Sequence, residues 1–562
     1  MKTKVLLLAS VATLTLVMLV AGCTRTTKTS KKAADGSADT AAEFAIEAGK
    51  AAQGQSKVKL AQCFECHDTV GTLHKSGTHK DVNCISCHTE LAAHLADSAD
   101  RPGTDTSWQS CGQCHAQQMD TMLQVSYHRP ARDEKSQPTN RIPVWYDKLM
   151  APHGFTKEHA LTRPHALMLI DQYVVDRAFG GRFQPKHGWE YVLETGRVWD
   201  ILEDTHPEEP GQKSFLPQTA TANNPVCINC KTADHILDWA YMGDPDVGAK
   251  WSRTSNSVQM AKSTNYGINC FFCHDPHAAK PRIIRDALIE ALSDETADNV
   301  YTRDANRTKI EVITMGERGY ERKIALLDKP DSRLMCAQCH VEYNCNPGTN
   351  AETGEPVGFN SRLTNHYPLK NALELYTHYY EDIKFVDFKN KFDGAPLWKG
   401  QHPEFETYYE STHSKLGVGC ADCHTQMSVK GEGGKFTDHF AQSPRHIAKA
   451  ACLKSGCHSQ WTEEQAIYTM DSVKAYTKGR MRKAEFWLST LIDKINEANR
   501  ANVSPEVLEA ARKAHSQAHI LWEYWTAENS DGFHNPALAR QSLTQSITIS
   551  TNAIDALDNA MK

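Results

Sequence analysis

The chain has little apolar content for its length and no concentrated block of positive charge. Only 40% of its 562 residues are hydrophobic, although a chain of this length is expected to form two or three domains. The 62 basic residues are interspersed with 68 acidic ones, giving a net charge of −6. Because no basic patch or stripe is present, we exclude nucleic acid as a partner. The low apolar content also implies that groups other than side chains help to fill the core.

Long hydrophobic runs are also scarce, and the one that stands out lies at the N-terminus. Val5–Val20 follows two lysines and has the length of a signal peptide, which is short for a membrane span. It leads into Leu19–Cys23, which resembles a bacterial lipobox. We therefore expect residues 1–22 to be a lipoprotein signal peptide, Cys23 to carry a lipid anchor, and residues 23–55 to form a flexible tether on the periplasmic or cell-surface side of a bacterial membrane. Ordinary secretory cleavage and a retained anchor are the alternatives.

Cysteine is abundant and arranged in pairs. Six Cys-x-x-Cys-His runs occur, beginning at Cys63, Cys84, Cys111, Cys270, Cys336 and Cys420. Two more units vary the pattern: one ends in Cys230–Lys231, and the other, Cys452–Cys457–His458, has four intervening residues. Cys-x-x-Cys-His is the attachment signature of c-type haem, in which two thiols bond to the haem and the histidine binds its iron. Disulfides or zinc sites would not require a histidine directly after almost every pair.

The pattern predicts eight covalently bound haem c groups, or seven if the eighth unit is empty. The expected attachment residues and proximal ligands are Cys63, Cys66, His67, Cys84, Cys87, His88, Cys111, Cys114, His115, Cys227, Cys230, Lys231, Cys270, Cys273, His274, Cys336, Cys339, His340, Cys420, Cys423, His424, Cys452, Cys457 and His458. Attachment of c-type haem takes place outside the cytoplasm, which agrees with an export signal.

The spacing of these units divides the chain into regions. Residues 56–135 hold three closely spaced units and form a trihaem module, and residues 136–461 hold the other five. Residues 462–562 contain no cysteine and show apolar residues at helical spacing, which predicts three helices, the first of them long. These helices either buttress the haem region or form a subunit interface of a homo-oligomer. We expect a mainly α multihaem cytochrome c with little β structure, a haem-packed core and long C-terminal helices.

Lys231 stands where a proximal histidine is usual. Lysine has a reference pKa of about 10.4, so its amine must lose a proton before it can bind iron. Such a ligand indicates a specialised, desolvated site rather than a simple electron-transfer haem. The alternative is that Lys231 merely follows the pair and iron takes a ligand from elsewhere.

Two further segments resemble a known family. Cys339–Cys345 reads CHVEYNC, and Lys399–Glu406 reads KGQHPEFE. Together with the Lys231 unit and the run from His413 to His424, they resemble the pentahaem, ammonia-forming cytochrome c nitrite reductases over roughly residues 140–530. Eight haem units, and a cysteine two residues after Tyr343, make the chain more similar to the octahaem nitrite reductases.

The resemblance implies a catalytic haem with Lys231 as its proximal ligand and an open opposite face. Tyr343 and His402 would line that face, and Cys345 would form a thioether to the Tyr343 ring, unless it is a plain free thiol. The family also has an active-site arginine in an Arg-Gly-His…Asp…Arg stretch. Arg163–His165, with Pro164 in place of glycine, matches this stretch and implies Arg177. Arg182 and Arg197 are the competing candidates.

The resemblance further implies a calcium ion beside the active site. Glu342 and Gln401 would bind it through side-chain oxygens, and Tyr343 and Lys399 through their carbonyl groups. Oxygen-only ligation of this kind suits calcium. Without the resemblance, Glu342 would be read as a solvated acid.

Seven haems with two histidine ligands each require seven distal histidines. Our candidates are His79, His94, His128, His165, His277, His413 and His439. Each could instead be an ordinary surface or core histidine. His515 and His519 lie one helical turn apart, but we expect them to be structural because no third metal ligand is evident nearby.

By resemblance, the protein reduces nitrite to ammonium by six electrons and also reduces hydroxylamine, using a quinol-linked or cytochrome electron donor. Two other functions stay open. An octahaem hydroxylamine oxidoreductase would have the same architecture but normally carries histidine where this chain has Lys231. A multihaem electron-transfer conduit would have every iron bound on both faces by protein.

Overall fold

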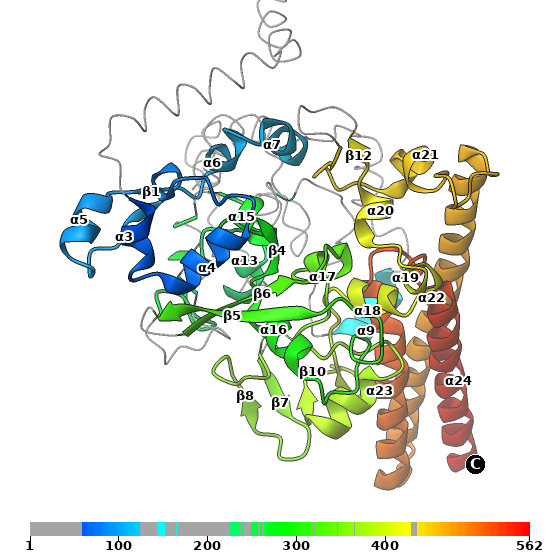
Figure 1. The fold of residues 1–562 in the computed structure, drawn as a ribbon. Helices are drawn as coiled ribbons and strands as arrows, with labels where there is room; N and C mark the ends of the chain where they lie inside the picture. Colours follow the sequence, from blue (N-terminus) through cyan, green and yellow to red (C-terminus); the bar gives the residue numbers. More distant parts are fainter. Residues whose placement is uncertain are drawn as a thin grey trace, which may run out of the picture.

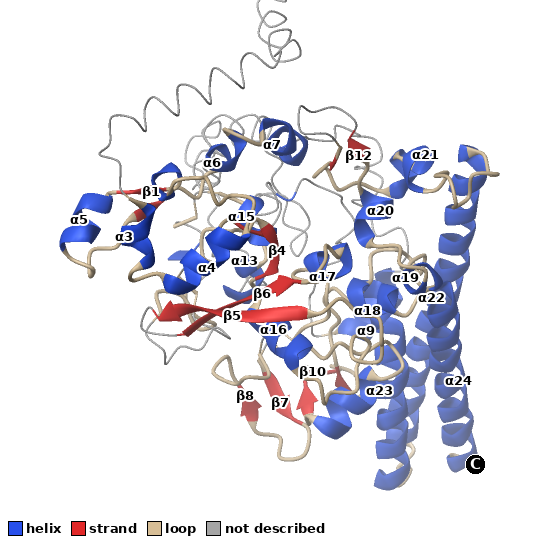
Figure 2. Cartoon of the chain, in the orientation of Figure 1, coloured by secondary structure: helices blue, strands red, loops and turns tan. Residues whose placement is uncertain are grey.

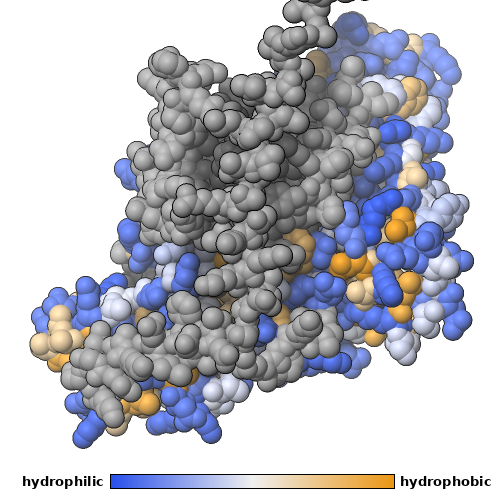
Figure 3. Space-filling model, turned by 90° about the horizontal axis from the view of Figure 1, so that it is seen from above, coloured by the Kyte–Doolittle hydropathy of each residue, from blue (hydrophilic) through white to orange (hydrophobic). Residues whose placement is uncertain are grey.

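The computed structural model describes residues 59–123, 143–151, 165, 225–236, 238–239, 249–256, 259–260, 263–264, 266–317, 321–344, 347–364, 366–428 and 435–562. The expected signal peptide, Cys23 and the tether lie outside these residues. Within them, helices predominate and strands are short (Figure 2), as expected from the sequence. No helix in these ranges is both long and apolar enough to cross a bilayer. Seen from above, the described surface is mainly hydrophilic, with apolar side chains in small spots (Figure 3).

Three long helices form the C-terminal region, which confirms the prediction from its periodicity. They are α22 (Glu463–Arg500), α23 (Pro505–Ala527) and α24 (Pro536–Ala560), drawn orange to red in Figure 1. A capping box begins α22, where the Thr462 hydroxyl accepts from Gln465 N at 3.2 Å and the Gln465 side chain accepts from Thr462 N at 2.8 Å. The other two helices each have proline at the first helical position, where a missing N–H costs nothing.

The three helices share an apolar core with the preceding region. Leu488 of α22, Trp522 of α23 and Leu543 of α24 belong to one buried cluster with Tyr146 of α9 (Pro143–Met150). Lys148 of α9 donates to the Ser489 carbonyl of α22 at 2.8 Å. The helices therefore buttress the rest of the molecule, which is one of the two roles expected for them.

The largest sheet is formed by strands from the middle of the chain, and the N-terminal module packs against it. Its antiparallel order is β3 (His274–Asp275), β4 (Lys280–Ile283), β6 (Glu321–Leu327) and β5 (Ile310–Glu317). Leu73, on α4 (Asp68–Ser76), packs with Ile324 and Leu326 of β6. A three-stranded sheet of β8 (Pro356–Val357), β7 (Gly348–Asn350) and β9 (Phe385–Val386) lies lower in Figure 1.

Each of the eight cysteine motifs begins within, or directly after, a short helix. These helices are α3 (Leu60–Phe64), η1 (Cys84–Ser86), α6 (Trp108–Gly112), α13 (Pro225–Asn229), α15 (Cys270–Cys273), α17 (Ser332–Cys336), α20 (Cys420–His424) and α21 (Ala448–Ala451). Helical spacing places residues i, i+3 and i+4 on one face, so both thiols and the histidine can meet one haem. His340 N, for example, donates to Cys336 O at 2.9 Å. In the eighth unit His458 N donates to Cys452 O at 3.1 Å, so the longer loop bulges while its ends close in the same way.

The helix core gives a stability prediction. The indole N–H of Trp525 donates to the Ser542 hydroxyl at 2.6 Å, and both side chains are buried. In Ser542→Ala the indole loses its partner in an apolar site, so we expect a loss of about 1–3 kcal/mol in the free energy of unfolding. Urea unfolding followed by circular dichroism measures it. Thr548→Ala, on the exposed face of α24, should change stability by less than about 0.5 kcal/mol, and equal effects of the two substitutions would contradict the prediction.

Candidate haem centres and active site

Histidine rings from distant parts of the chain face one another in pairs. All seven expected proximal histidines have a second histidine whose ring centroid lies 6.0–6.5 Å away, and six of them form separate pairs. The pairs, with the proximal residue first, are His67–His94, His88–His277, His115–His79, His274–His439, His424–His534 and His458–His413. Two iron–nitrogen bonds of about 2 Å, plus about 1.1 Å from each Nε2 to its ring centre, add to about 6.2 Å. Each pair is thus spaced to hold one iron atom.

The hydrogen bonds of these rings leave Nε2 for the metal. Nδ1 of His79 donates to the Pro276 carbonyl at 2.8 Å, and Nδ1 of His94 to the Asp100 carbonyl at 2.8 Å. Nδ1 of His534 lies 2.6 Å from the buried Glu528 carboxylate. An oxygen partner on the far nitrogen fixes the tautomer and orientation of an imidazole ligand.

His534 is the ligand candidate that the sequence prediction missed. It lies between α23 and α24, far along the chain from His424, which it faces at 6.1 Å. The sequence beside His534, Asn535–Pro536, marks only the start of α24, and the cysteine-free tail holds no haem motif that would indicate a ligand. The candidate His128 lies outside the described residues, as do Arg177 and Cys345 and the side chain of Cys227.

His340 has two histidine neighbours instead of one. Its ring lies 6.4 Å from that of His402, edge to face. It also lies close to His165, whose pKa is lowered to about 4 by burial and by the charge that His340 would carry. Nδ1 of His340 lies 3.7 Å from the Glu404 carboxylate. The geometry thus leaves His165 and His402 as competitors for the iron bound by His340.

Thiols of different motifs lie side by side and define an order of haem sites. Three pairs of thiols are within hydrogen-bonding reach: Cys63 and Cys84, Cys111 and Cys270, and Cys336 and Cys420. Three further pairs are near enough to influence each other electrostatically: Cys87 and Cys111, Cys273 and Cys336, and Cys423 and Cys452. The motif that ends in Lys231 lies beside this row rather than within it. A hydrogen bond from the Cys339 thiol lowers the pKa of the buried Cys230 to about 5, and the Cys339 thiol lies 3.7 Å from the Cys230 carbonyl. The Lys231 motif therefore adjoins the motif that ends in His340.

The residues expected to line the open haem face come together. Tyr343 is buried, and its ring lies 6.3 Å from that of His402 at an angle of 18°. Tyr343 also contacts Tyr367, with ring centroids 5.7 Å apart. The guanidinium of Arg285 is buried and donates to the Tyr367 hydroxyl at 3.1 Å. Arg285 also lies near Cys230, so a buried positive charge that the sequence analysis did not identify adjoins the lysine unit.

Three of the residues expected to bind calcium, Glu342, Lys399 and Gln401, are buried and linked by hydrogen bonds. Glu342 Oε2 accepts from Gln401 N at 2.8 Å, whereas Glu342 Oε1 is buried without a hydrogen-bond partner. Burial raises the pKa of Glu342 and of the neighbouring Glu406 well above the usual range. A divalent cation would favour the ionised form of both acids, so these residues fit the group. Within the described residues no three His, Cys, Asp or Glu side chains converge on a metal position, so amide and carbonyl oxygens must complete such a site.

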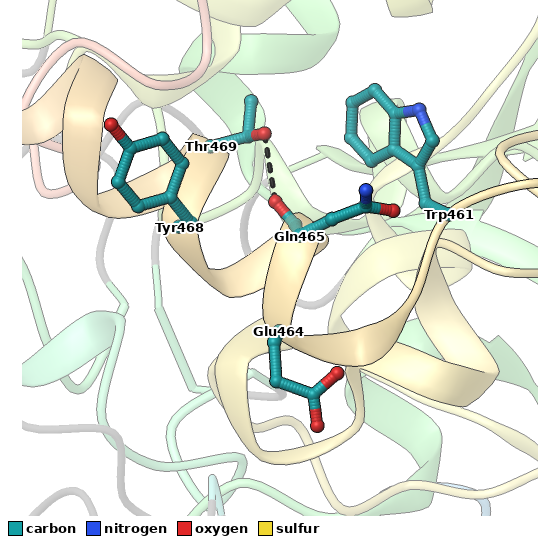
Figure 4. A pocket seen from close by; sticks show the side chains of 5 residues that line it. All are labelled: Trp461, Glu464, Gln465, Tyr468 and Thr469. Carbon is teal, nitrogen blue, oxygen red and sulfur yellow. Dashed lines mark hydrogen bonds between the residues drawn. The ribbon is translucent and has the colours of Figure 1, made fainter.

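A shallow pocket at the start of α22 is separate from this region. It is lined by Trp461, Glu464, Gln465, Tyr468 and Thr469 (Figure 4). The Trp461 ring stacks on His458 at 4.2 Å, so the pocket adjoins the eighth haem unit. It brings together no group of catalytic side chains, and we do not assign the active site to it.

The paired rings on a mainly helical fold define a multihaem c-type cytochrome. More narrowly, the family model for cytochrome c552 matches residues 143–562, and the chain belongs to that family. The cytochrome c nitrite reductase subunit NrfA of Nitratidesulfovibrio vulgaris is 28% identical over 65% of this chain and 66% of the relative. Cytochrome c-552 of Parabacteroides distasonis is 28% identical over 66% of this chain and 64% of the relative. The matched region thus spans just under two thirds of these relatives.

A solved structure has the same fold. The structure of cytochrome c nitrite reductase from Desulfovibrio desulfuricans, a study of two calcium sites in its catalytic subunit NrfA, aligns with a TM-score of 0.52. The alignment covers 81% of this chain and 86% of that one at 21% identity. The fold of the chain is therefore that of a cytochrome of this class.

The ring pairs predict a spectroscopic change on substitution of His534. In His534→Ala the iron bound by His424 loses its second imidazole, so one haem should change from low spin to high spin while total haem is unchanged. Electron paramagnetic resonance measures the change, and added imidazole should reverse it. The exposed His446→Ala serves as control, and an unaltered spin state in His534→Ala would exclude this residue as a ligand.

Proposed function

We propose that the protein is an exported octahaem cytochrome c that reduces nitrite to ammonium by six electrons at the haem of the Lys231 unit, and that also reduces hydroxylamine. The observation that carries the proposal is the placement of Tyr343 and His402 together beside the motif that adjoins Lys231. The named nitrite reductase among the relatives supports the same reaction. A lysine ligand favours this function over hydroxylamine oxidation and over a conduit.

The side chains of this region suit a small anion. The buried Arg285 and the imidazole of His402 favour negative charge, and Arg177 is the further cation that the family resemblance implies. Hydrogen bonds from His402 to nitrite oxygens would stabilise the charge that develops as N–O bonds break. The His402 imidazole has one nitrogen that can donate a proton and one that can accept one, so it is suited to pass protons to the substrate. The Tyr343 hydroxyl is a second proton donor, and a thioether from Cys345 would make it more acidic.

The row of haem sites supplies the electrons. Bound haem provides redox chemistry that no side chain offers, and the protein determines its order and surroundings. The thiol contacts run from the Cys63 motif to the Cys452 motif and pass the Lys231 unit at the motif of His340. Electrons from a quinol-linked or cytochrome donor could thus enter at either end. We assign His165 as the distal ligand opposite His340, which leaves His402 to the substrate pocket.

We further propose that the protein carries a lipid anchor and forms a homo-oligomer, and that it binds a calcium ion beside the active site. Glu342 and Gln401, with the carbonyls of Tyr343 and Lys399, would hold the ion next to the pocket. Lys399 is fixed there by its ammonium group, which lies 2.8 Å from the Glu523 carboxylate of α23, with both side chains almost fully buried. The ion would thereby hold the segment that carries His402 in a defined position.

Replacement of the lysine ligand tests the catalytic assignment. Lys231→His should keep full haem content, because both thiols remain, but should alter the high-spin signal and lower nitrite turnover at least about 100-fold. Haem content, the resonance spectrum and nitrite-dependent oxidation of a reduced viologen are measured together. The exposed Lys309→His is the matched control, and unchanged turnover in Lys231→His would show that the catalytic haem lies elsewhere.

Neutralising one carboxylate tests the calcium site. Glu342→Gln keeps the shape of the side chain but removes its charge, so the calcium affinity should fall at least about tenfold. Metal analysis by plasma mass spectrometry after dialysis gives the calcium content per chain, with the exposed Glu352→Gln as control. If Glu342→Gln retains as much calcium as the unsubstituted protein, the ion is not bound by this carboxylate.

A further inference from the structure

One histidine pair differs from those spaced for iron. The Nε2 atoms of His366 and His378 lie 2.8 Å apart, the ring centroids 5.1 Å apart, and the ring planes within 8° of each other. Adding about 1.1 Å from each Nε2 to its ring centre accounts for the 5.1 Å, so the two rings lie end to end in one plane, the geometry of an N–H···N hydrogen bond. An iron atom would need its two nitrogen ligands about 4 Å apart. This pair therefore shares a proton rather than a metal.

His366 belongs to a wall of the candidate pocket. Its carbonyl accepts from Asn344 N at 3.0 Å, and Asn344 directly follows Tyr343. The next residue, Tyr367, contacts the Tyr343 ring. The backbone that carries His366 thus runs beside the tyrosine that faces His402.

His378 lies on a π-helix that connects this wall with the surface. The helix spans Thr377–Asp382, and its wider turn is closed by a hydrogen bond from Ile383 N to His378 O at 3.0 Å. Short π-helices are rare and occur frequently at functional sites. The adjacent Tyr379 is buried against Trp398, and burial together with the nearby Glu342 raises its pKa. Thr377, directly before His378, is exposed, whereas Tyr379, directly after it, is fully buried, so the helix reaches from the surface into the interior.

Both rings are neutral near pH 7. Burial lowers the pKa of His366 to about 3 and that of His378 to about 4, and the ammonium of Lys370 further disfavours charge on His378. A neutral imidazole has one N–H donor and one nitrogen acceptor. A proton accepted at Nδ1 of His378 can therefore cross the Nε2–H···Nε2 bond and leave from Nδ1 of His366, with no electron transferred.

We propose that His378 and His366 form a proton relay that carries protons from solvent at the π-helix to the Tyr343 side of the active site. The inference rests on the proposed function. Reduction of nitrite consumes eight protons with its six electrons and yields ammonium and two waters. The haems deliver electrons only, so the protons need a route of their own through the protein. His378 and His366 are joined by a direct hydrogen bond between their imidazole rings, so a proton can pass from one to the other without an intervening group.

Two substitutions at one position separate a relay from a structural contact. His378→Gln keeps a side chain that can hydrogen-bond to His366 but cannot pass a proton, whereas His378→Phe removes the hydrogen bond as well. We expect both to lower kcat for nitrite at least about tenfold, with KM, haem content and the spin state of the Lys231 haem unchanged. The solvent deuterium isotope effect on kcat should rise, and added imidazole should restore part of the rate. The exposed His446→Gln is the control.

The possible outcomes test the proton relay and the proposed reduction of nitrite separately. If the unsubstituted protein reduces nitrite and His378→Gln matches it in kcat and isotope effect, the relay is excluded, even if His378→Phe is impaired, because the pair then only holds the wall in place. Reduction of the haems by dithionite without nitrite needs no proton delivery to the site and should be equal in all variants. If the unsubstituted protein itself fails to reduce nitrite, the proposed function fails independently of the pair.

Discussion

The structure depends on the distance between paired imidazole rings. A spacing of 6.0–6.5 Å between ring centroids lies within the range of aromatic contacts and also matches one iron atom with its two nitrogen ligands. Rings are brought to this distance from remote segments, as for His88 and His277 or His424 and His534. The protein is therefore assembled around groups that are not amino acids, which explains how a chain with 40% hydrophobic residues sustains a large core.

Local patterns were predictable from the sequence, and tertiary pairings were not. The attachment motifs form helical turns, which place the thiols at i and i+3 on one face. The C-terminal helices were predictable from their apolar periodicity and their helix-start residues. Which histidine faces which motif depends on how distant segments pack. His277 stands three residues after His274 in the sequence but faces His88. His534 faces His424 but has no cysteine motif near it in the sequence that would identify it as a ligand.

In the candidate active site, too, some residues were predictable from local sequence motifs and others only from the fold. Tyr343, His402, Glu342 and Gln401 were identified through two short segments that resemble a family, and the structure brings them together. Arg285, Tyr367 and the pair of His366 and His378 have no motif around them. Only the fold reveals that Tyr367 contacts Tyr343, that Arg285 bonds to Tyr367, and that the histidine pair adjoins the same backbone. A separation of 5.1 Å instead of about 6.2 Å is enough to distinguish a pair that shares a proton from one that shares a metal.

The central claim is that one haem, held by an amine, keeps a face open to substrate while the others are closed by two imidazoles. Low-temperature electron paramagnetic resonance of the purified protein, recorded with and without nitrite, tests it most directly. The account predicts one high-spin iron whose signal changes when nitrite is added, against a background of low-spin irons that do not respond. A spectrum in which every iron is low spin and indifferent to nitrite would contradict it and would favour an electron conduit.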